Sequence, residues 1–314
     1  MTSLRQLGSS DLEVFPLALG GNVFGWTADE AQSFAVLDAY AAAGGNFVDT
    51  ADVYSAWAPG NEGGESETVI GNWLAARGNR ADMLIATKVG GHPQYKGLSA
   101  GTVKGGVEAS LRRLRTDYVD LYYTHFDDPS VPVEEILTAL DELVRAGKVR
   151  AIAASNISPE RLQESLDLSD REGLARYVAL QPHYSLVSRD TYEGPLQDIA
   201  SRGGLAVVPY SALAKGFLTG KYRPGVQIDS PRAGAAGAYL ESERGRRVLA
   251  ALDEVGQERG AELATVALAW LLSRPTVAAP IASARNLEQL PALLGVADLT
   301  LTDADLAKLT AASA

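Results

Sequence analysis

The sequence predicts an α/β protein, a (β/α)8 TIM barrel, as a single domain over residues 1–314. Short segments that are apolar on both faces alternate with longer amphipathic segments, and the short ones number eight. A chain of 314 residues has room for eight such units. Together these observations favour a closed barrel over a doubly wound sheet.

Eight segments are expected to form the barrel strands, because each is a short apolar run bounded by turn residues. In chain order they are residues 14–21 (VFPLALGG), 46–51 (NFVDTA), 83–90 (MLIATKVG), 118–125 (YVDLYYTH), 149–156 (VRAIAASN), 177–184 (YVALQPHY), 205–212 (LAVVPYSA) and 276–283 (TVAAPIAS).

Helix-capping signals mark the segments between these strands. In residues 26–45, Thr27 and Glu30 have capping-box spacing, and Gly44 can end the helix in a left-handed conformation. Similar signals are Pro132 and Gly147 at the two ends of residues 131–149, and an N-cap Ser158 followed by Pro159.

Two segments depart from the alternation. Residues 3–15 read as an N-terminal β-hairpin, turned at Gly8, Ser9 and Ser10, that could close the barrel floor. Residues 215–247, after the seventh strand, are rich in Gly, Arg and Ser and predict a long functional loop.

Composition excludes several functions. The formal net charge of −11 would repel a nucleic acid across most of the surface. No apolar run approaches the ~20 residues that cross a bilayer, and residues 1–10 lack the apolar core of a secretory signal, so a cytoplasmic protein is expected. There is no cysteine and there are only three histidines, His92, His125 and His183, so a catalytic metal is not expected.

Polar residues follow the predicted strands. Because the carboxyl ends of all barrel strands meet at one rim, where catalytic groups of this fold lie, these side chains should converge. Each could equally be a strand terminator that bonds to water or backbone. They are Asp49, Lys88, His125, Asn156, Gln181, Tyr210 and Ser283.

Three of these rim residues, together with Tyr54, form a candidate proton-transfer group. The segment NFVDTADVYS places Asp49, Asp52 and Tyr54 within six residues. An inward Lys88 needs a partner, for which Asp49 is the natural choice. A charged Lys88 beside Tyr54 should lower the pKa of the phenol from about 10. His125 would complete the group at the same rim.

The order Asp49, Tyr54, Lys88, His125 resembles the catalytic tetrad of the aldo-keto reductases, and the resemblance covers nearly the whole chain. The layout is most similar to the bacterial branch that resembles potassium-channel β subunits. The segments that carry it are DTADVYSAWAPGNEGGESETVIGNWL, TKVG, DLYYTH, AASN, QPHYSL, VPYSALAKGFLTGKY and PIASARNLEQL.

The resemblance implies reversible, NADPH-dependent reduction of aldehydes or ketones, with Tyr54 as proton donor and without a Rossmann domain. No G-x-G-x-x-G joins a strand to a helix in the sequence. It further implies a role in cofactor binding for Ser155, Asn156, Gln181, Tyr210, Ser211, Leu213, Lys215, Gly216, Lys221, Ser283, Arg285 and Gln289.

The adenosine end departs from the family pattern. Ala212 stands where many relatives have proline, Ala282 where they often have glycine, and Ala292 with Leu293 replaces an acidic or amide pair. Arg285 could bind a 2′-phosphate, which favours NADP over NAD. For a carbonyl substrate, the candidate pocket residues are Trp26, Trp57, Tyr95 and Phe126, which could stack a sugar or an aromatic ring or else only pack the loops.

Two other functions remain open on the sequence. One is a Schiff-base aldolase-type barrel with Lys88 as nucleophile, which borohydride trapping would reveal. The other is a regulatory subunit that binds NADPH and turns over negligibly, which steady-state turnover measured against bound cofactor would distinguish. The residues do not indicate an oligomeric state or a physiological substrate.

Overall fold

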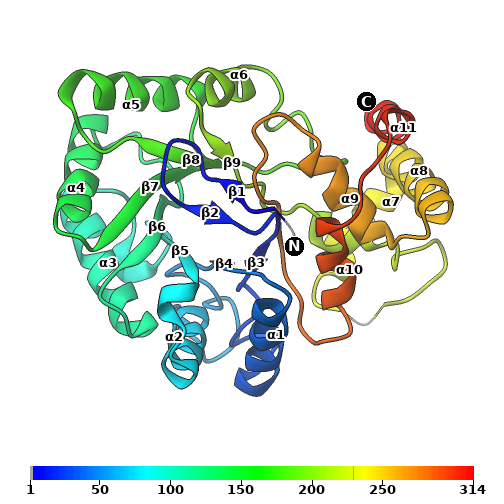
Figure 1. Cartoon of the computed structure of the whole chain (residues 1–314), viewed down its shortest axis with the longest axis horizontal. Coiled ribbons are helices and arrows are strands. Elements are labelled where there is room, and N and C mark those ends of the chain that lie inside the picture. Colours follow the sequence, from blue (N-terminus) through cyan, green and yellow to red (C-terminus); the bar gives the residue numbers. More distant parts are fainter. Residues whose placement is uncertain (1–2, 229) are drawn as a thin grey trace.

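Eight parallel strands form the centre of the computed structural model, which describes residues 3–228 and 230–314 (Figure 1). All eight predicted strands are confirmed, each shorter than the apolar run that contains it. Their order in the sheet is β10-β3-β4-β5-β6-β7-β8-β9. Their bounds are β3 (Ala18–Gly20), β4 (Phe47–Asp49), β5 (Leu84–Val89), β6 (Val119–Thr124), β7 (Val149–Ser155), β8 (Tyr177–Gln181), β9 (Ala206–Val207) and β10 (Ile281–Ala282).

The sheet closes on itself between its first and last strands. Val207 of β9 pairs in parallel with Val277, just before β10. The Val207 amide donates to the Thr276 carbonyl at 2.8 Å, and the Ala278 amide donates to the Val207 carbonyl at 2.9 Å. The predicted (β/α)8 barrel is therefore confirmed.

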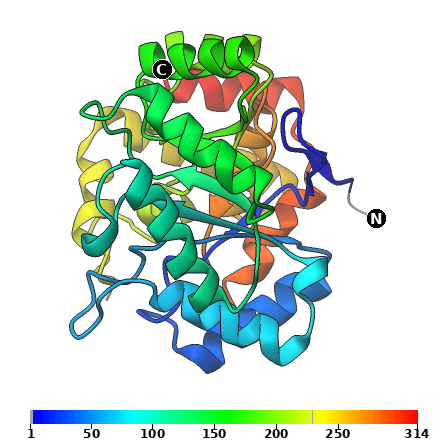
Figure 2. The same ribbon diagram turned by 90° about the vertical axis from the view of Figure 1, so that its left-hand side faces the viewer.

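Helices surround the barrel (Figures 1 and 2). The regular helices are α1 (Glu30–Ala42), α2 (Glu65–Arg77), α3 (Ala100–Leu114), α4 (Val133–Arg145), α5 (Pro159–Glu172), α6 (Pro195–Arg202), α7 (Ala233–Glu241), α8 (Glu243–Arg259), α9 (Leu263–Leu272), α10 (Leu290–Leu294) and α11 (Asp303–Ala312). Short 3-10 turns are η1 (Arg80–Asp82), η2 (Pro93–Tyr95), η3 (Ala214–Thr219) and η4 (Gly295–Ala297).

Strand alternation decides which side chains enter the barrel. On β5, Ile85 and Val89 belong to the outer core beneath the helices, whereas Ala86 belongs to the inner core. Because side chains alternate along a strand, Lys88 shares the inward face with Ala86. On β4, Phe47 lies in the inner core, so Asp49 also points inward.

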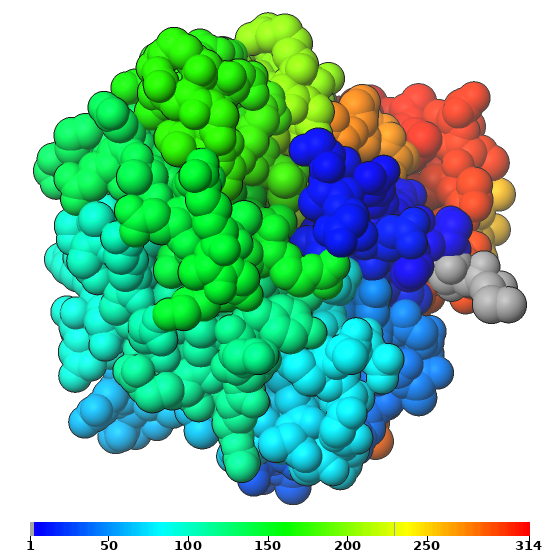
Figure 3. All heavy atoms as spheres, turned by 60° about the vertical axis from the view of Figure 1, so that its left-hand side comes forward, coloured from blue at the N-terminus to red at the C-terminus, as the bar shows by residue number. Residues whose placement is uncertain are grey.

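The N-terminal hairpin is confirmed as β1 (Arg5–Gln6) paired with β2 (Glu13–Val14). Its apolar side chains Leu7, Leu12 and Val14 belong to the same buried cluster as the barrel interior. Gly8 has φ +56, and a Cβ there would lie 2.1 Å from the Val178 carbonyl oxygen, so only glycine fits. The hairpin, dark blue in Figure 3, lies against the surface at one end of the barrel.

Of the two predicted helix N-caps, Ser158 is confirmed and Thr27 is wrong. Ser158 is the N-cap of α5 with Pro159 at its first turn, as predicted. The capping box expected at Thr27 is wrong, because Asp29 and Gln32 form it instead. Thr27 lies two residues before this N-cap, in a turn where its amide donates to the Val23 carbonyl and so is not free to pair with the Glu30 side chain.

The long segment after the seventh strand is less irregular than predicted. Residues 233–247 are helical, forming α7 and the start of α8, so the loop prediction is wrong there. The Tyr239 ring packs on Phe217 with centroids 5.3 Å apart, and Ser242 caps α8 by accepting from the Gly245 amide. These contacts outweigh the low helix propensity of Gly234 and Gly237.

Candidate active site

The inward lysine of β5 is the centre of a buried polar group. Lys88 Nζ donates to Asp49 Oδ2 at 2.7 Å, to the Thr50 carbonyl at 2.7 Å and to the Tyr54 hydroxyl at 2.9 Å. An ammonium has three N–H donors and a neutral amine has two, so these three acceptors fit a charged Lys88. Burial lowers the pKa of Lys88, and Asp49 opposes that shift.

Tyr54 follows the strand on a turn that fixes its position. The next residue, Ser55, has φ 72, a left-handed conformation that is costly for a residue with a side chain. Its hydroxyl donates to the Phe24 carbonyl at 2.8 Å, which holds the turn. Tyr54 accepts from Lys88, so its own proton stays available to a ligand, and Asp49 Oδ2 is 3.5 Å away at the limit of a hydrogen bond.

The expected lowering of the Tyr54 pKa is wrong. Burial raises the pKa of Tyr54 well above its usual value, and the Asp49 carboxylate adds to the rise. Both effects disfavour the phenolate more strongly than Lys88 favours it. Tyr54 therefore carries its proton at neutral pH, which suits a proton donor.

His125, immediately after β6, lies beside Tyr54 with ring centroids 6.0 Å apart. Burial lowers the pKa of His125 to about 3, and the Lys88 charge adds to the effect, so the imidazole is neutral. Its Nδ1 atom is buried without a hydrogen-bond partner in the described residues. Only Nε2 can therefore meet a ligand.

Hydrogen bonds join these four residues to three of the predicted cofactor-binding residues. Gln181 Nε2 donates to Asp49 Oδ1 at 2.8 Å, and Ser155 Oγ donates to the Gln181 carbonyl at 2.8 Å. Asn156 Nδ2 donates to the His125 carbonyl at 2.8 Å. The structure thus brings together, at one rim, side chains from β4, β5, β6, β7 and β8.

A cavity of about 650 Å³ opens beside Tyr54 and Asp49 and runs to β10. That volume lies within the range of ligand sites. Nine predicted cofactor-binding residues line it: Tyr210, Ser211, Leu213, Lys215, Gly216, Lys221, Ser283, Arg285 and Gln289. Ser155, Asn156 and Gln181 lie outside its lining, although Asn156 accepts from the Tyr210 hydroxyl at 2.8 Å.

The loop after β9 has a left-handed backbone at several positions. Ser211, Ala214 and Lys215 have positive φ values of 54, 47 and 58, and Gly216 continues the left-handed run with φ 92. The Ala214 and Gly216 amides donate to the Ser211 and Leu213 carbonyls, both at 2.8 Å, which closes the loop into tight turns that carry the Lys215 side chain at the cavity wall. The Tyr210 ring begins this loop and stacks on His183 with centroids 5.3 Å apart.

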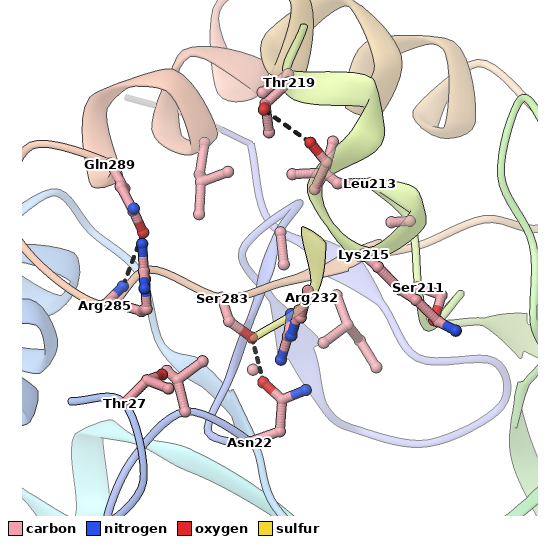
Figure 4. Close-up of a pocket in the computed structure, with 18 of the residues that line it drawn as sticks. Asn22, Thr27, Ser211, Leu213, Lys215, Thr219, Arg232, Ser283, Arg285 and Gln289 are labelled. Atoms are coloured by element: carbon pink, nitrogen blue, oxygen red, sulfur yellow. Dashed lines mark hydrogen bonds between the residues drawn. The ribbon is translucent and has the colours of Figure 1, made fainter. Parts of the chain in front are cut away.

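Four cations surround the cavity without an ion-pair partner among residues 3–228 and 230–314: Lys215, Lys221, Arg232 and Arg285. Figure 4 shows Arg285, Arg232 and Lys215 on its walls, together with the 2.8 Å hydrogen bond from Ser283 to Asn22. Burial lowers the pKa of Arg232, and the charge of Arg285 adds to this. Two such neighbouring cations favour an anionic ligand.

Arg232 and Asn22 line the cavity but were missed by sequence reasoning. The signal for Arg232 was its place in a segment flagged as a functional loop, but nothing in the sequence separates it from the other arginines there. Asn22 directly follows the Gly20–Gly21 end of the first strand run, which carries no ionisable residue.

The four predicted substrate residues have different locations. Trp26 and Trp57 line the cavity and meet edge to face, with centroids 5.6 Å apart. Phe126 lies outside the lining, half exposed and stacked on His125 at 4.5 Å. Tyr95 is not a cavity residue, since it packs on His92 and near Gly105 of α3. Substrate binding by Tyr95 therefore stays a prediction.

Within residues 3–228 and 230–314, no cluster of three or more metal-binding side chains is present. In the same residues, none of the helices has the length and apolar character of a membrane span.

Comparison with known proteins links the chain to one family. The model for the Aldo/keto reductase family matches residues 16–314. Protein tas of Escherichia coli is 32% identical, with 98% of this chain and 96% of that protein covered. An aryl-alcohol dehydrogenase [NADP(+)] of Phanerodontia chrysosporium is 31% identical over 95% and 82%. A probable voltage-gated potassium channel subunit beta of Oryza sativa is 34% identical over 91% and 88%.

Proposed function

Because the chain belongs to the aldo/keto reductase family, an oxidoreductase family, we propose that it reversibly reduces aldehydes or ketones with NADPH. The observation that carries the proposal is the protonated Tyr54 phenol at the wall of a ligand-sized cavity, bonded to the buried Lys88–Asp49 pair.

In this proposal a bound nicotinamide cofactor supplies the hydride. Tyr54 donates its proton to the carbonyl oxygen, while Lys88 and Asp49 hold the phenol in place. Neutral His125 donates from Nε2, so charge that develops on the oxygen meets two preorganised donors. Tyr54 is protonated at neutral pH, the form that reduction requires, whereas alcohol oxidation needs the phenolate and therefore a higher pH.

The cofactor would lie along the cavity. The Tyr210 ring would stack on the nicotinamide ring. Ser155, Asn156 and Gln181 would form hydrogen bonds to the carboxamide of the nicotinamide. Ser211, Leu213, Lys215, Gly216 and Lys221 would hold the pyrophosphate. Ser283, Arg285 and Gln289 would hold the adenosine phosphate, and the apolar Ala292 and Leu293 line the same end. The four cations favour the more highly charged NADPH over NADH.

A screen for loss of NADPH absorbance tests the proposal, with a panel of aldehydes, ketones and sugars. We expect aromatic aldehydes to be preferred, because Trp26 and Trp57 form an apolar wall next to Tyr54, whose ring is 6.0 Å from that of Trp57. Failure of every carbonyl in the panel, with NADPH bound, would favour the regulatory alternative. The similarity to a protein named as a probable voltage-gated potassium channel subunit beta is consistent with this regulatory alternative.

The geometry disfavours the aldolase alternative. Lys88 is fully buried, does not line the cavity and uses all three of its donors within the protein. A Schiff base requires a neutral amine that can reach the substrate carbonyl. Borohydride should therefore trap no adduct on Lys88.

We expect Arg285→Ala to weaken NADPH binding by about 2 kcal/mol, the scale of a charge-assisted hydrogen bond to phosphate. NADH lacks the 2′-phosphate, so its affinity should barely change. Fluorescence titration of both coenzymes measures this difference. The Arg285 side chain has no ion-pair partner among the described residues, so its removal should leave stability nearly unchanged.

Arg232→Ala is the matched control for the arginine at the adenosine end. Its guanidinium lines the cavity and lies 5.7 Å from the centre of the Trp26 ring. We therefore expect it to weaken NADPH and NADH equally, through the pyrophosphate that both carry. If Arg285→Ala weakened the affinity for both coenzymes equally, or for neither, Arg285 would not bind the 2′-phosphate. Lys215, Lys221 or Arg232 would then be its binding partner.

A further inference from the structure

One acid near the site has no place in the proposed reaction. Asp52 lies between Asp49 and Tyr54 in the chain, is fully buried and does not line the cavity. Neither of its carboxylate oxygens has a hydrogen-bond partner within the described residues. A buried, unpartnered carboxylate is costly in its charged form, and proteins seldom keep one without a use.

Asp52 lies between two charged networks. Its backbone amide donates to the Lys88 carbonyl at 3.2 Å, which ties it to the strand that carries the catalytic lysine. On its other side, Glu67 of α2 is also fully buried. Its carboxylate forms an ion pair with Arg113 of α3 at 2.6 Å and accepts a hydrogen bond from the Thr87 hydroxyl at 2.5 Å. Because Glu67 already occupies Arg113, Asp52 has no cation of its own among the described residues.

We propose that Asp52 is a positioning residue that controls Tyr54 through its own protonation state. When Asp52 loses its proton, a second negative charge lies next to the Lys88–Tyr54 pair, and proton donation by Tyr54 becomes slower. The inference rests on the proposed reductase function. It adds to that function an internal control of the proton donor by a group that touches neither substrate nor cofactor.

The surrounding charges set the pH at which this occurs. Burial raises the pKa of Asp52 to about 7 and Glu67 raises it further, whereas Arg113 and the nearby backbone amides of His92 and Val53 oppose this rise. His92, which flanks Asp52, has a lowered pKa and is neutral above pH 6.5. Tyr122 of β6 also faces Asp52, and burial raises its pKa well above the usual value, so it stays protonated. Asp52 is thus the group of this cluster that changes charge near neutral pH.

The charge on Asp52 reaches the catalytic pair. Ionised Asp52 raises the pKa of Tyr54 and also that of Lys88. A weaker acid donates its proton less readily, so the rate of carbonyl reduction should fall as pH rises through about 7. We expect a fall of about threefold to tenfold, since one unit of pKa is at most a factor of ten in proton transfer.

Asp52→Asn fixes the site in its neutral form. The variant should reduce carbonyls at the low-pH rate of the wild type, with no inflection near pH 7 in kcat. Asp141→Asn is the matched control, because Asp141 is also a buried acid but has partners in Arg145 and the Ala175 amide, on the far side of α4 from the site. That control should keep the inflection.

Stability gives a readout that does not depend on catalysis. The folded pKa of Asp52 lies above its unfolded value of about 3.9, so its contribution is fully present below pH 4 and is lost as pH rises through about 7. The melting temperature of Asp52→Asn should therefore exceed that of the wild type by a margin that widens from pH 4 to 7, reaching several degrees.

The direct test is the titration of aspartate γ-carbons by NMR in protein labelled at that position, with Asp52→Asn and Asp52→Ser to assign the resonance. A midpoint near pH 7 supports the inference. A midpoint below pH 5, or an inflection in kcat that survives in Asp52→Asn, overturns it. Absence of turnover at every pH, with Asp52 still titrating near neutrality, would instead overturn the reductase and with it the coupling to catalysis.

Discussion

Tyr54→Phe is expected to lower kcat for carbonyl reduction by at least about 100-fold, the scale of a lost general acid. Among residues 3–228 and 230–314, the proposed donor is the one hydroxyl that both accepts from Lys88 and lines the cavity. The phenyl ring keeps the packing, and Lys88 retains Asp49 and the Thr50 carbonyl as partners. NADPH affinity should therefore stay nearly intact, as measured by fluorescence titration beside steady-state kinetics.

Tyr123→Phe is the matched control for this variant. The Tyr123 hydroxyl lies in the same buried region, with its ring 5.8 Å from Lys88 Nζ, but it does not line the cavity. It also has no hydrogen-bond partner in the described residues, so its removal should change kcat little. If Tyr54→Phe retained most of the wild-type turnover, Tyr54 would not be the proton donor.

Lys88→Met is expected to lower the free energy of unfolding by about 3–5 kcal/mol as well as abolish turnover. The change leaves the Asp49 carboxylate buried without its cation, with the neutral Gln181 amide at 2.8 Å and the Tyr54 hydroxyl at 3.5 Å as donors, and an uncompensated buried charge has this cost. Chemical denaturation at pH 7 measures the loss. Lys104→Met is the surface control, because its ion pair with Glu142 is exposed and should contribute less than about 1 kcal/mol.

A double variant separates the charge from the packing. Asp49→Asn combined with Lys88→Met removes both charges, so most of the lost stability should return while turnover stays absent. A Lys88→Met variant that is as stable as the wild type would show that Asp49 takes up a proton when its partner is removed. Equal losses in the single and double variants would instead trace the effect to packing around residue 88.

The strands and the rim residues could be predicted because burial in a parallel sheet leaves a direct mark on the sequence. Each strand is apolar on both faces, and the first polar residue after it marks the carboxyl end. That rule found Asp49, Lys88 and His125 without knowledge of their contacts. It could not find Arg232, because no strand ends at this residue and its place in the cavity wall depends on contacts far apart in the sequence.

Properties that depend on competing interactions were harder to predict. Thr27 and Asp29 have equally good capping spacing, and the turn that occupies the Thr27 amide decides between them. Lys88 alone would lower the pKa of Tyr54, but the sequence does not show that the phenol is partly buried beside the Asp49 carboxylate, and these two effects reverse the sign. For the same reason, the sequence does not show that the carboxylate of Asp52 is buried without a hydrogen-bond partner among the described residues.

The hairpin at the barrel floor has a consequence for the order of folding. It is synthesised before every barrel strand and has one early contact, from Asn46 to the Glu13 carbonyl, but other contacts come from late segments: Gly8 fits under the Val178 and Gly204 carbonyls, and Arg5 donates to the Leu272 and Val277 carbonyls. Contacts so distant along the chain form slowly, because a long loop must close first. The hairpin can therefore dock fully only after nearly the whole chain has folded, so its docking would mark the closure of the barrel.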